Sequence, residues 1–159
     1  MKPVLLLFFC GAFSARAATP TSAGTPVLVE LFTSEGCSSC PSADRLLTRL
    51  AADQPIPGVL VVPLSLHVDY WNHLGWKDPF SSPQYTARQG TYARRFGSAG
   101  GVYTPQMVVD GRTEFVGSDE RAARRAIGES AREPKAIVRV VPNATGAARV
   151  TVAGVPGGA

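Results

Sequence analysis

Two cysteines separated by two serines, Cys37 and Cys40, stand between a short apolar run and a helical pattern. Residues 27–32 form the apolar run, and Pro41 must lie near the start of the helix, because proline is tolerated only in a first turn. A cysteine at a helix start feels the positive end of the backbone dipole, which favours the thiolate that attacks disulfides. This order of strand, dithiol and helix predicts a redox-active pair, with Cys37 as nucleophile and Cys40 as resolving thiol.

The cysteine count favours the same interpretation. The third cysteine, Cys10, lies in a predicted signal peptide, so the mature chain would keep only Cys37 and Cys40. A disulfide framework in a secreted domain uses more cysteines, spread farther apart. A bridge across two residues closes a loop too short to stabilise the fold much. An inert bridge or a metal clip remains an alternative, but structure alone explains the pair poorly.

The amino terminus predicts export. Residues 1–17 combine a basic start, an apolar run at 4–13 and the small-x-small sequence Ala15-Arg16-Ala17, which is typical of a cleaved signal peptide. We therefore expect a periplasmic or secreted protein with no membrane contact after cleavage. Residues 18–26 are rich in Thr, Ser, Gly and Pro and predict a disordered leader. Cleavage lowers the formal net charge from +4 to +2, too little to indicate a nucleic-acid partner.

The rest of the chain alternates strands and helices. A second buried strand at 59–66 would pair parallel with the first, although Pro63 suggests a bulge or an early end there. The remaining predicted elements are a helix from Pro41 that is ended by residues 55–58, a loop at 67–80, a helix from the cap Ser82 to Phe96, a hairpin of 106–109 and 112–116 around Asp110-Gly111, a helix capped by Ser118, and two strands at 136–141 and 147–152.

Over residues 27–132 this order resembles the thioredoxin superfamily. The match rests on Cys37-Ser38-Ser39-Cys40 and on residues 102–111, which look like the cis-proline loop and following hairpin of that superfamily. The resemblance implies an α/β thioredoxin-like fold, a central mixed sheet flanked by helices, followed by a short β extension at 133–159. It also implies a cis Thr104–Pro105 bond, with Pro105 against the dithiol and the backbone of Thr104 free to pair with substrate. The alternative is a trans proline that starts a strand.

A closer resemblance comes from four segments: 29–41, 67–71, 74–80 and 103–107. Together they resemble the secreted family catalogued as domain of unknown function 1223, which is thioredoxin-like and has no established substrate. Its members usually carry a longer β-rich carboxyl-terminal region. The chain is therefore expected to be either a shortened member or a fragment.

Two acidic residues lie close to the dithiol in sequence. Thioredoxin has a buried acid at a place similar to that of Glu30, so the resemblance implies that Glu30 accepts the Cys40 proton, although its offset is one residue longer. The alternative is a solvated or ion-paired glutamate at a sheet edge. Glu35 is expected to be a turn residue whose charge opposes thiolate formation.

The loop that begins at His67 is rich in aromatic and histidine residues. Tyr70, Trp71 and Trp76, with Tyr103 of the second motif, are candidates for a substrate-binding wall beside the dithiol. Alternatively, His67 or His73 joins Cys37 and Cys40 around copper or zinc, although the spacing fits no usual zinc pattern. The simplest alternative is that the aromatic residues are core and the histidines hydrogen-bond backbone.

The leading hypothesis is an exported thiol–disulfide oxidoreductase that needs no cofactor and acts on protein thiols and disulfides. A periplasmic copper metallochaperone using the same dithiol is the second hypothesis, since soft thiolates suit copper(I). A redox-inactive scaffold whose aromatic loop binds a partner is the third. The sequence does not indicate an oligomeric state.

Overall fold

A computed structural model describes residues 24–97, 101–143 and 146–157. The predicted signal peptide, residues 1–17, lies outside the described residues, as does most of the predicted leader. The elements in chain order are β1 (Thr25–Thr33), α1 (Pro41–Asp53), β2 (Val59–His67), the short 3-10 helix η1 (Asn72–Leu74), α2 (Pro83–Phe96), β3 (Gln106–Val109), β4 (Thr113–Val116), α3 (Glu120–Ser130), β5 (Ile137–Pro142) and β6 (Ala148–Ala153).

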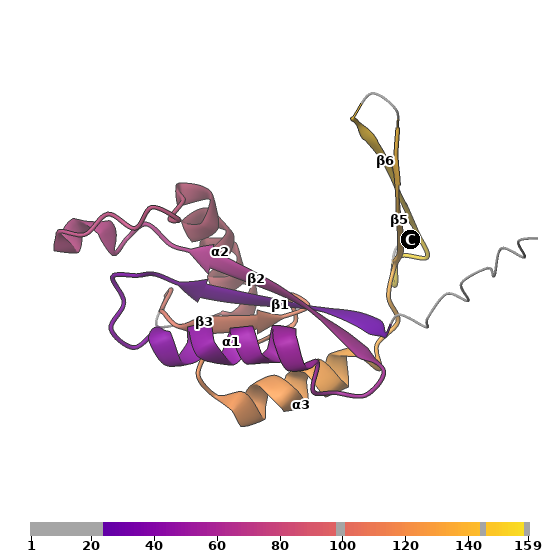
Figure 1. Cartoon of the computed structure of the whole chain (residues 1–159), viewed down its shortest axis with the longest axis horizontal. Helices are drawn as coiled ribbons and strands as arrows, with labels where there is room; N and C mark the ends of the chain where they lie inside the picture. Colours follow the sequence, from indigo (N-terminus) through magenta and orange to yellow (C-terminus); the bar gives the residue numbers. More distant parts are fainter. Residues whose placement is uncertain (1–23, 98–100, 144–145, 158–159) are drawn as a thin grey trace, which may run out of the picture.

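Four strands form one mixed sheet in the order β2-β1-β3-β4. β1 pairs parallel with β2 and antiparallel with β3, and β3 pairs antiparallel with β4. Helices α1 and α3 cover one face of this sheet and α2 covers the other (Figure 1). The predicted α/β class and the mixed sheet flanked by helices are thus confirmed.

Strand β1 has apolar side chains on both faces, and helices cover both faces. Val27, Val29 and Leu31 pack in one cluster with residues of α1 and α3, whereas Phe32 packs with α2. Side chains of a strand alternate between its faces, so Glu30 belongs to the α2 face with Phe32. This alternation decides which residues of β1 can reach the dithiol.

Three predicted boundaries change in the structure. β1 begins at Thr25, inside the predicted leader, because the Thr25 N–H donates to the Gly58 carbonyl at 2.8 Å and pairing with β2 continues from there. β2 runs through Pro63 without a break, since it is an edge strand, where a missing N–H is tolerated. The cap of α3 is Asp119 rather than Ser118, because the Asp119 carboxylate accepts the Ala122 N–H at 2.9 Å.

Being an edge strand also changes the burial of β2. Val61 and Leu66 are buried as predicted, but Leu60, Val62 and Leu64 are 41, 37 and 41 % exposed, so the prediction of a buried strand was wrong for these three. The caps of α2 are confirmed: the Ser82 hydroxyl accepts the Gln84 N–H, and Gly97 ends the helix in the left-handed region at φ 63°. The two predicted carboxyl-terminal strands are also confirmed, within one residue at each end.

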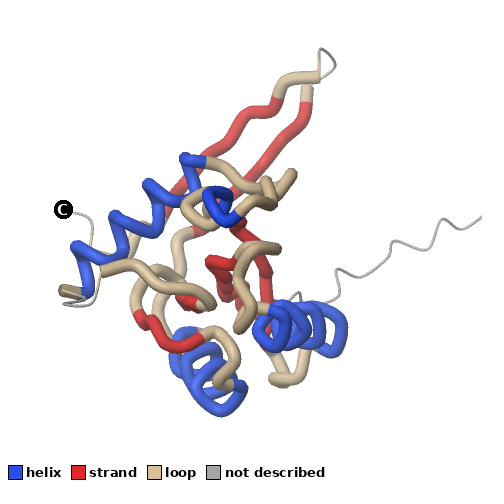
Figure 2. Tube along the Cα trace, turned by 90° about the vertical axis from the view of Figure 1, so that its left-hand side faces the viewer, coloured by secondary structure: helices blue, strands red, loops and turns tan. Residues whose placement is uncertain are grey.

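Strands β5 and β6 form a separate two-stranded sheet. This hairpin extends away from the four-stranded sheet and its helices (Figures 1 and 2), and all of its strand residues are exposed. Among the described residues, no helix is long and apolar enough to cross a membrane.

Candidate dithiol site

Cys37 and Cys40 form a disulfide at the junction of β1 and α1, with an S–S distance of 2.11 Å and a Cα–Cα distance of 5.4 Å. Cys40 is the N-cap of α1 and Pro41 its first residue, so Cys37 lies in the preceding turn rather than in the helix. Cys37 is 3 % exposed and Cys40 is fully buried, an order that suits attack at Cys37. The Cys40 N–H donates to the Cys37 carbonyl at 3.2 Å, which closes the turn.

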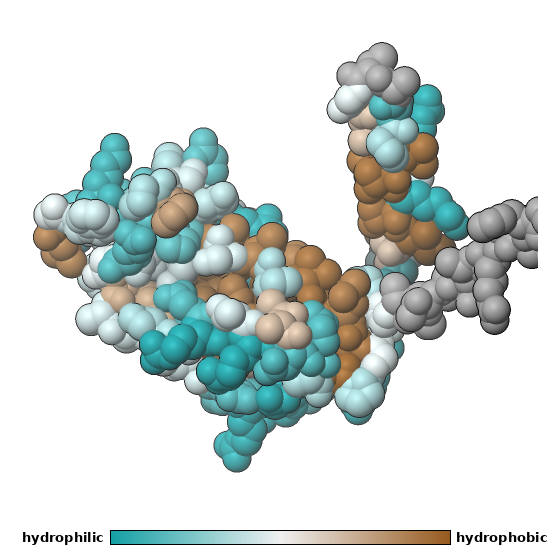
Figure 3. Space-filling model, viewed as in Figure 1, coloured by the Kyte–Doolittle hydropathy of each residue, from teal (hydrophilic) through white to brown (hydrophobic). Residues whose placement is uncertain are grey.

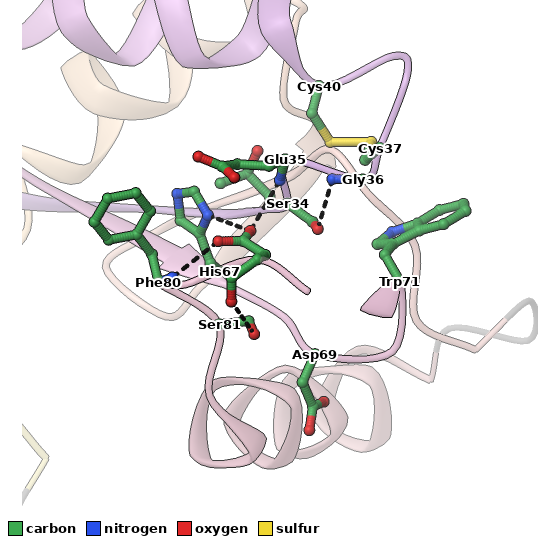
Figure 4. A network of polar contacts seen from close by, with 12 residues as sticks. Ser34, Glu35, Gly36, Cys37, Cys40, His67, Asp69, Trp71, Phe80 and Ser81 are labelled. Carbon is green, nitrogen blue, oxygen red and sulfur yellow. Dashed lines mark hydrogen bonds and ion pairs between the residues drawn. A yellow bond between two sulfur atoms is a disulfide. The ribbon is translucent and has the colours of Figure 1, made fainter. Parts of the chain in front are cut away.

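The buried carboxylate of Asp78 links the segments that lead to this turn. Figure 4 shows its neighbours Glu35, His67 and Phe80. It accepts the N–H of Glu35 at 2.9 Å and the N–H of Phe80 at 2.9 Å, and it lies 2.7 Å from His67 Nδ1. Burial alone would raise the pKa of Asp78, but these donors outweigh it and hold the pKa below its usual range. Asp78 therefore ties the segment before Cys37 to the end of β2 and to the long loop.

Sequence reasoning missed Asp78 as a site residue. It lies in segment 74–80, which carried the family resemblance, but a single loop aspartate has no periodicity that would reveal burial. Only the fold shows that its carboxylate meets a backbone N–H from a segment 43 positions away in the chain.

The loop around Thr104 closes another side of the site. The Thr104–Pro105 peptide bond is cis, as the resemblance implied. The Trp71 indole N–H donates to the Thr104 hydroxyl at 2.8 Å, and Trp71 lies beside Gly36, the residue before Cys37 (Figure 4). A Cβ at Gly36 would stand 3.1 Å from the Trp71 Cβ, so glycine allows this close approach.

The contacts of Gly117 show that Pro105 lies close to α1. Its N–H donates to the Pro105 carbonyl at 2.9 Å. A Cβ at Gly117 would stand 3.1 Å from the Pro105 Cβ and 3.2 Å from the Cβ of Ala43, which is in the first turn of α1. Pro105 therefore packs near the start of the helix that Cys40 caps.

Tyr70 and Tyr103, two of the predicted substrate-binding residues, both form a hydrogen bond with Gln89 of α2. Gln89 is buried in α2, donates to the Tyr103 carbonyl at 2.7 Å and accepts the Tyr70 hydroxyl at 3.2 Å. The Tyr103 hydroxyl donates to Glu114 at 2.9 Å. Burial raises the pKa of both tyrosines, and the Glu114 carboxylate raises that of Tyr103 further. Their hydroxyls thus make internal hydrogen bonds.

Glu30 lies on the face of the sheet opposite to α1, so the expected proton transfer from Cys40 does not fit the structure. Its buried carboxylate accepts Arg88 Nε at 2.5 Å and the Tyr92 hydroxyl at 2.6 Å, both from α2. Burial and the Glu30 carboxylate raise the pKa of Tyr92 to about 12. The one-residue difference in offset explains the error, because a shift of one residue along a strand reverses the face.

The remaining candidates lie in the long loop. Trp76 is 60 % exposed, and its indole N–H donates to the Glu35 carboxylate at 2.7 Å, on the segment just before the dithiol. His67 lies against Asp78, and His73 Nδ1 lies 2.7 Å from the Tyr70 carbonyl. Within the part of the chain that the structure describes, no three or more His, Cys, Asp or Glu residues gather as metal ligands. The structure therefore does not assemble the copper or zinc site.

Comparisons with known proteins place the chain in a family. A family model described as "Protein of unknown function (DUF1223)" matches residues 28–156. The chain is similar to the X-ray crystal structure of protein AGR_C_4864 from Agrobacterium tumefaciens, with a TM-score of 0.63 and 40 % sequence identity. The similarity covers 77 % of this chain and 53 % of that one, so the chain spans about half the length of its relative. None of the curated proteins compared matches the chain. The chain belongs to the DUF1223 family of proteins of unknown function.

Proposed function

We propose that this chain is an exported thiol–disulfide oxidoreductase with a thioredoxin-like fold, which exchanges disulfides with protein substrates through Cys37 and Cys40. The observation that carries the proposal is the disulfide at a strand-to-helix junction, with the cis-proline loop beside it. A bridge that closes so short a loop contributes little to stability, so its position is better explained by chemistry. Export rests on the signal-peptide pattern of residues 1–17.

The exchange has two steps in either direction. In the reduced protein, the Cys37 thiolate attacks a substrate disulfide, forms a mixed disulfide and releases one substrate sulfur as a thiolate. The Cys40 thiolate then attacks Cys37 Sγ, which restores the Cys37–Cys40 disulfide and releases the second substrate sulfur. In reverse, a substrate thiolate attacks Cys37 Sγ of the oxidised protein and Cys40 leaves as a thiolate. A second substrate thiolate then attacks the substrate sulfur of the mixed disulfide, which forms the substrate disulfide and releases Cys37 as a thiolate.

The surroundings of the dithiol suit a polypeptide substrate. Trp71 lies beside Gly36, the residue before Cys37, and binds the Thr104 hydroxyl. No hydrogen bond to the Thr104 backbone is found among the described residues. Three apolar side chains are exposed on the loop whose Asp78 carboxylate accepts the Glu35 N–H. The exposed fractions are 60 % for Leu74, 60 % for Trp76 and 65 % for Phe80. These exposed side chains, on a loop held to the segment before Cys37, give a partner protein apolar groups to contact.

The test is to trap the mixed disulfide. A Cys40→Ser variant retains the attacking thiol but cannot resolve the intermediate, so it should accumulate a stable adduct with oxidised glutathione and with a disulfide-containing protein. A Cys37→Ser variant should form far less adduct, because Cys40 is fully buried. Intact-protein mass spectrometry without reductant measures both. Equal adduct yields in the two variants, or none in either, would contradict the proposal.

A further inference from the structure

The two serines between the cysteines are not equivalent in the structure. Ser39 Oγ lies 3.5 Å from Cys37 Sγ, within hydrogen-bonding range of a sulfur atom, whereas Ser38 makes no side-chain hydrogen bond among the described residues. Both serines are exposed. The sequence alone gives no reason to distinguish them, because each supplies one hydroxyl next to a cysteine.

Few other donors are available to Cys37. The Cys40 N–H donates to the Cys37 carbonyl, and Pro41, the first residue of α1, has no N–H. Within the described residues, no other side chain forms a hydrogen bond with Cys37 Sγ. Two backbone positions at the start of the helix, Cys40 and Pro41, thus offer the sulfur no free N–H.

Two carboxylates lie in the segments that flank the turn. Glu35, in the segment before Cys37, directs its carboxylate to the Trp76 indole N–H. Asp44, in the first turn of α1, accepts the Thr33 hydroxyl at 2.8 Å. Both charges oppose a thiolate at Cys37. A hydroxyl that donates to the sulfur acts against the effect of these two charges.

We propose that Ser39 is a catalytic residue, whose hydroxyl donates a hydrogen bond to the Cys37 thiolate. This inference rests on the proposed function. In the disulfide, Cys37 Sγ is a weak acceptor, but reduction makes the same atom an anionic acceptor with the hydroxyl already beside it. The hydroxyl stabilises Cys37 both as the attacking thiolate and as the group that leaves when the mixed disulfide is broken from the substrate side.

The experiment compares Ser39→Ala with Ser38→Ala in the full chain. For each reduced protein, the pH dependence of the Cys37 alkylation rate by iodoacetamide, checked by the ultraviolet absorbance of the thiolate, gives the pKa of Cys37. Ser39→Ala should raise this pKa by about one unit, which is roughly tenfold less thiolate at a pH below the pKa. Ser38→Ala should leave it unchanged, and Ser39→Thr, which keeps a hydroxyl, should restore most of the loss.

The outcomes separate this inference from the proposed function. Equal pKa values in the two alanine variants and wild type would overturn the role of Ser39, while mixed-disulfide trapping at Cys37 could still succeed. A shift of the same size in both alanine variants would likewise overturn it, since the effect would then belong to the loop and not to one hydroxyl. Failure of wild-type Cys37 to form any mixed disulfide would reject the proposed function itself.

Discussion

At the scale of single residues, two buried carboxylates show how the surroundings of a residue set its role. Glu30 is paired with Arg88 and Tyr92 on the face away from the dithiol, whereas Asp78 holds the Glu35 N–H on the dithiol side. Both are satisfied by hydrogen bonds, as buried charges must be. Their hydrogen-bond partners, rather than their residue type, decide which one affects the site.

Asp78→Asn should lower the free energy of unfolding at neutral pH. It should also make that free energy depend less on pH under acidic conditions. The pKa of Asp78 is lower in the folded state, so its stabilising effect is present above the unfolded pKa of about 3.9 and is lost as pH falls through the lower folded value. We expect a loss of about 1–3 kcal/mol at neutral pH. Urea unfolding of the oxidised protein at several pH values measures both effects. Asp53→Asn, at the exposed end of α1, is the control, and the prediction fails if the two variants behave alike.

Glu30→Gln should lower stability and leave the pH profile of disulfide exchange unchanged. Its carboxylate accepts hydrogen bonds from Arg88 and Tyr92 and lies across the sheet from α1. Losing charge-assisted hydrogen bonds should cost about 1–3 kcal/mol. Chemical denaturation and the rate of glutathione exchange against pH test the two parts. A shifted rate profile would restore the proton-transfer role that the resemblance suggested.

At the scale of elements, the sequence predicted the order and type of the three α-helices and of the four strands of the mixed sheet. The pattern of α1, the caps Ser82 and Gly97, and the turn at Asp110-Gly111 are local signals, so they can be read without the fold. The position of β2 at the edge, and hence its exposure, depends on sheet order, which local sequence does not encode. The contacts of Asp78, Trp71 and Gly117 join distant segments and are likewise fixed only by the fold.

Gly117→Ala should destabilise the junction of β4, the Pro105 loop and α1. A Cβ there would stand 2.7 Å from Leu31 Cδ1 and press on Pro105 and Ala43. Overpacking of this kind costs about 1–3 kcal/mol. Gly128→Ala is the matched control: it lies inside α3 with open space around it, so alanine should stabilise the protein by about 0.5–1 kcal/mol. Thermal or urea unfolding measures the change in stability of each variant. A change of the same sign in both variants would contradict the packing described around Gly117.

At the scale of the whole molecule, the hairpin β5–β6 carries an apolar face. Its cross-strand pairs place Val138, Val140, Val150 and Val152 on one side, and all four are more than half exposed (Figure 3). Two strands alone are only marginally stable in water. The stability of the described chain therefore comes from the four-stranded sheet and its helices.

Replacing one exposed valine and one buried valine by alanine should show that the hairpin contributes less to stability than the core does. Val140→Ala should change stability by less than about 0.5 kcal/mol, because the side chain is already exposed. Val29→Ala, in the core between the sheet and α1, should cost about 2 kcal/mol or more. Equilibrium unfolding of the two variants provides the comparison. A large effect of Val140→Ala would mean that the hairpin is covered in solution.

The most direct test of the central claim is the reduction potential of the Cys37–Cys40 pair, measured by equilibrating the protein against glutathione under metal-free conditions. A catalytic dithiol predicts a value within about −120 to −270 mV, where known thiol–disulfide oxidoreductases lie. The value within that range would also show whether the protein donates or removes disulfides. A potential below about −300 mV would mark a structural bridge and contradict the account.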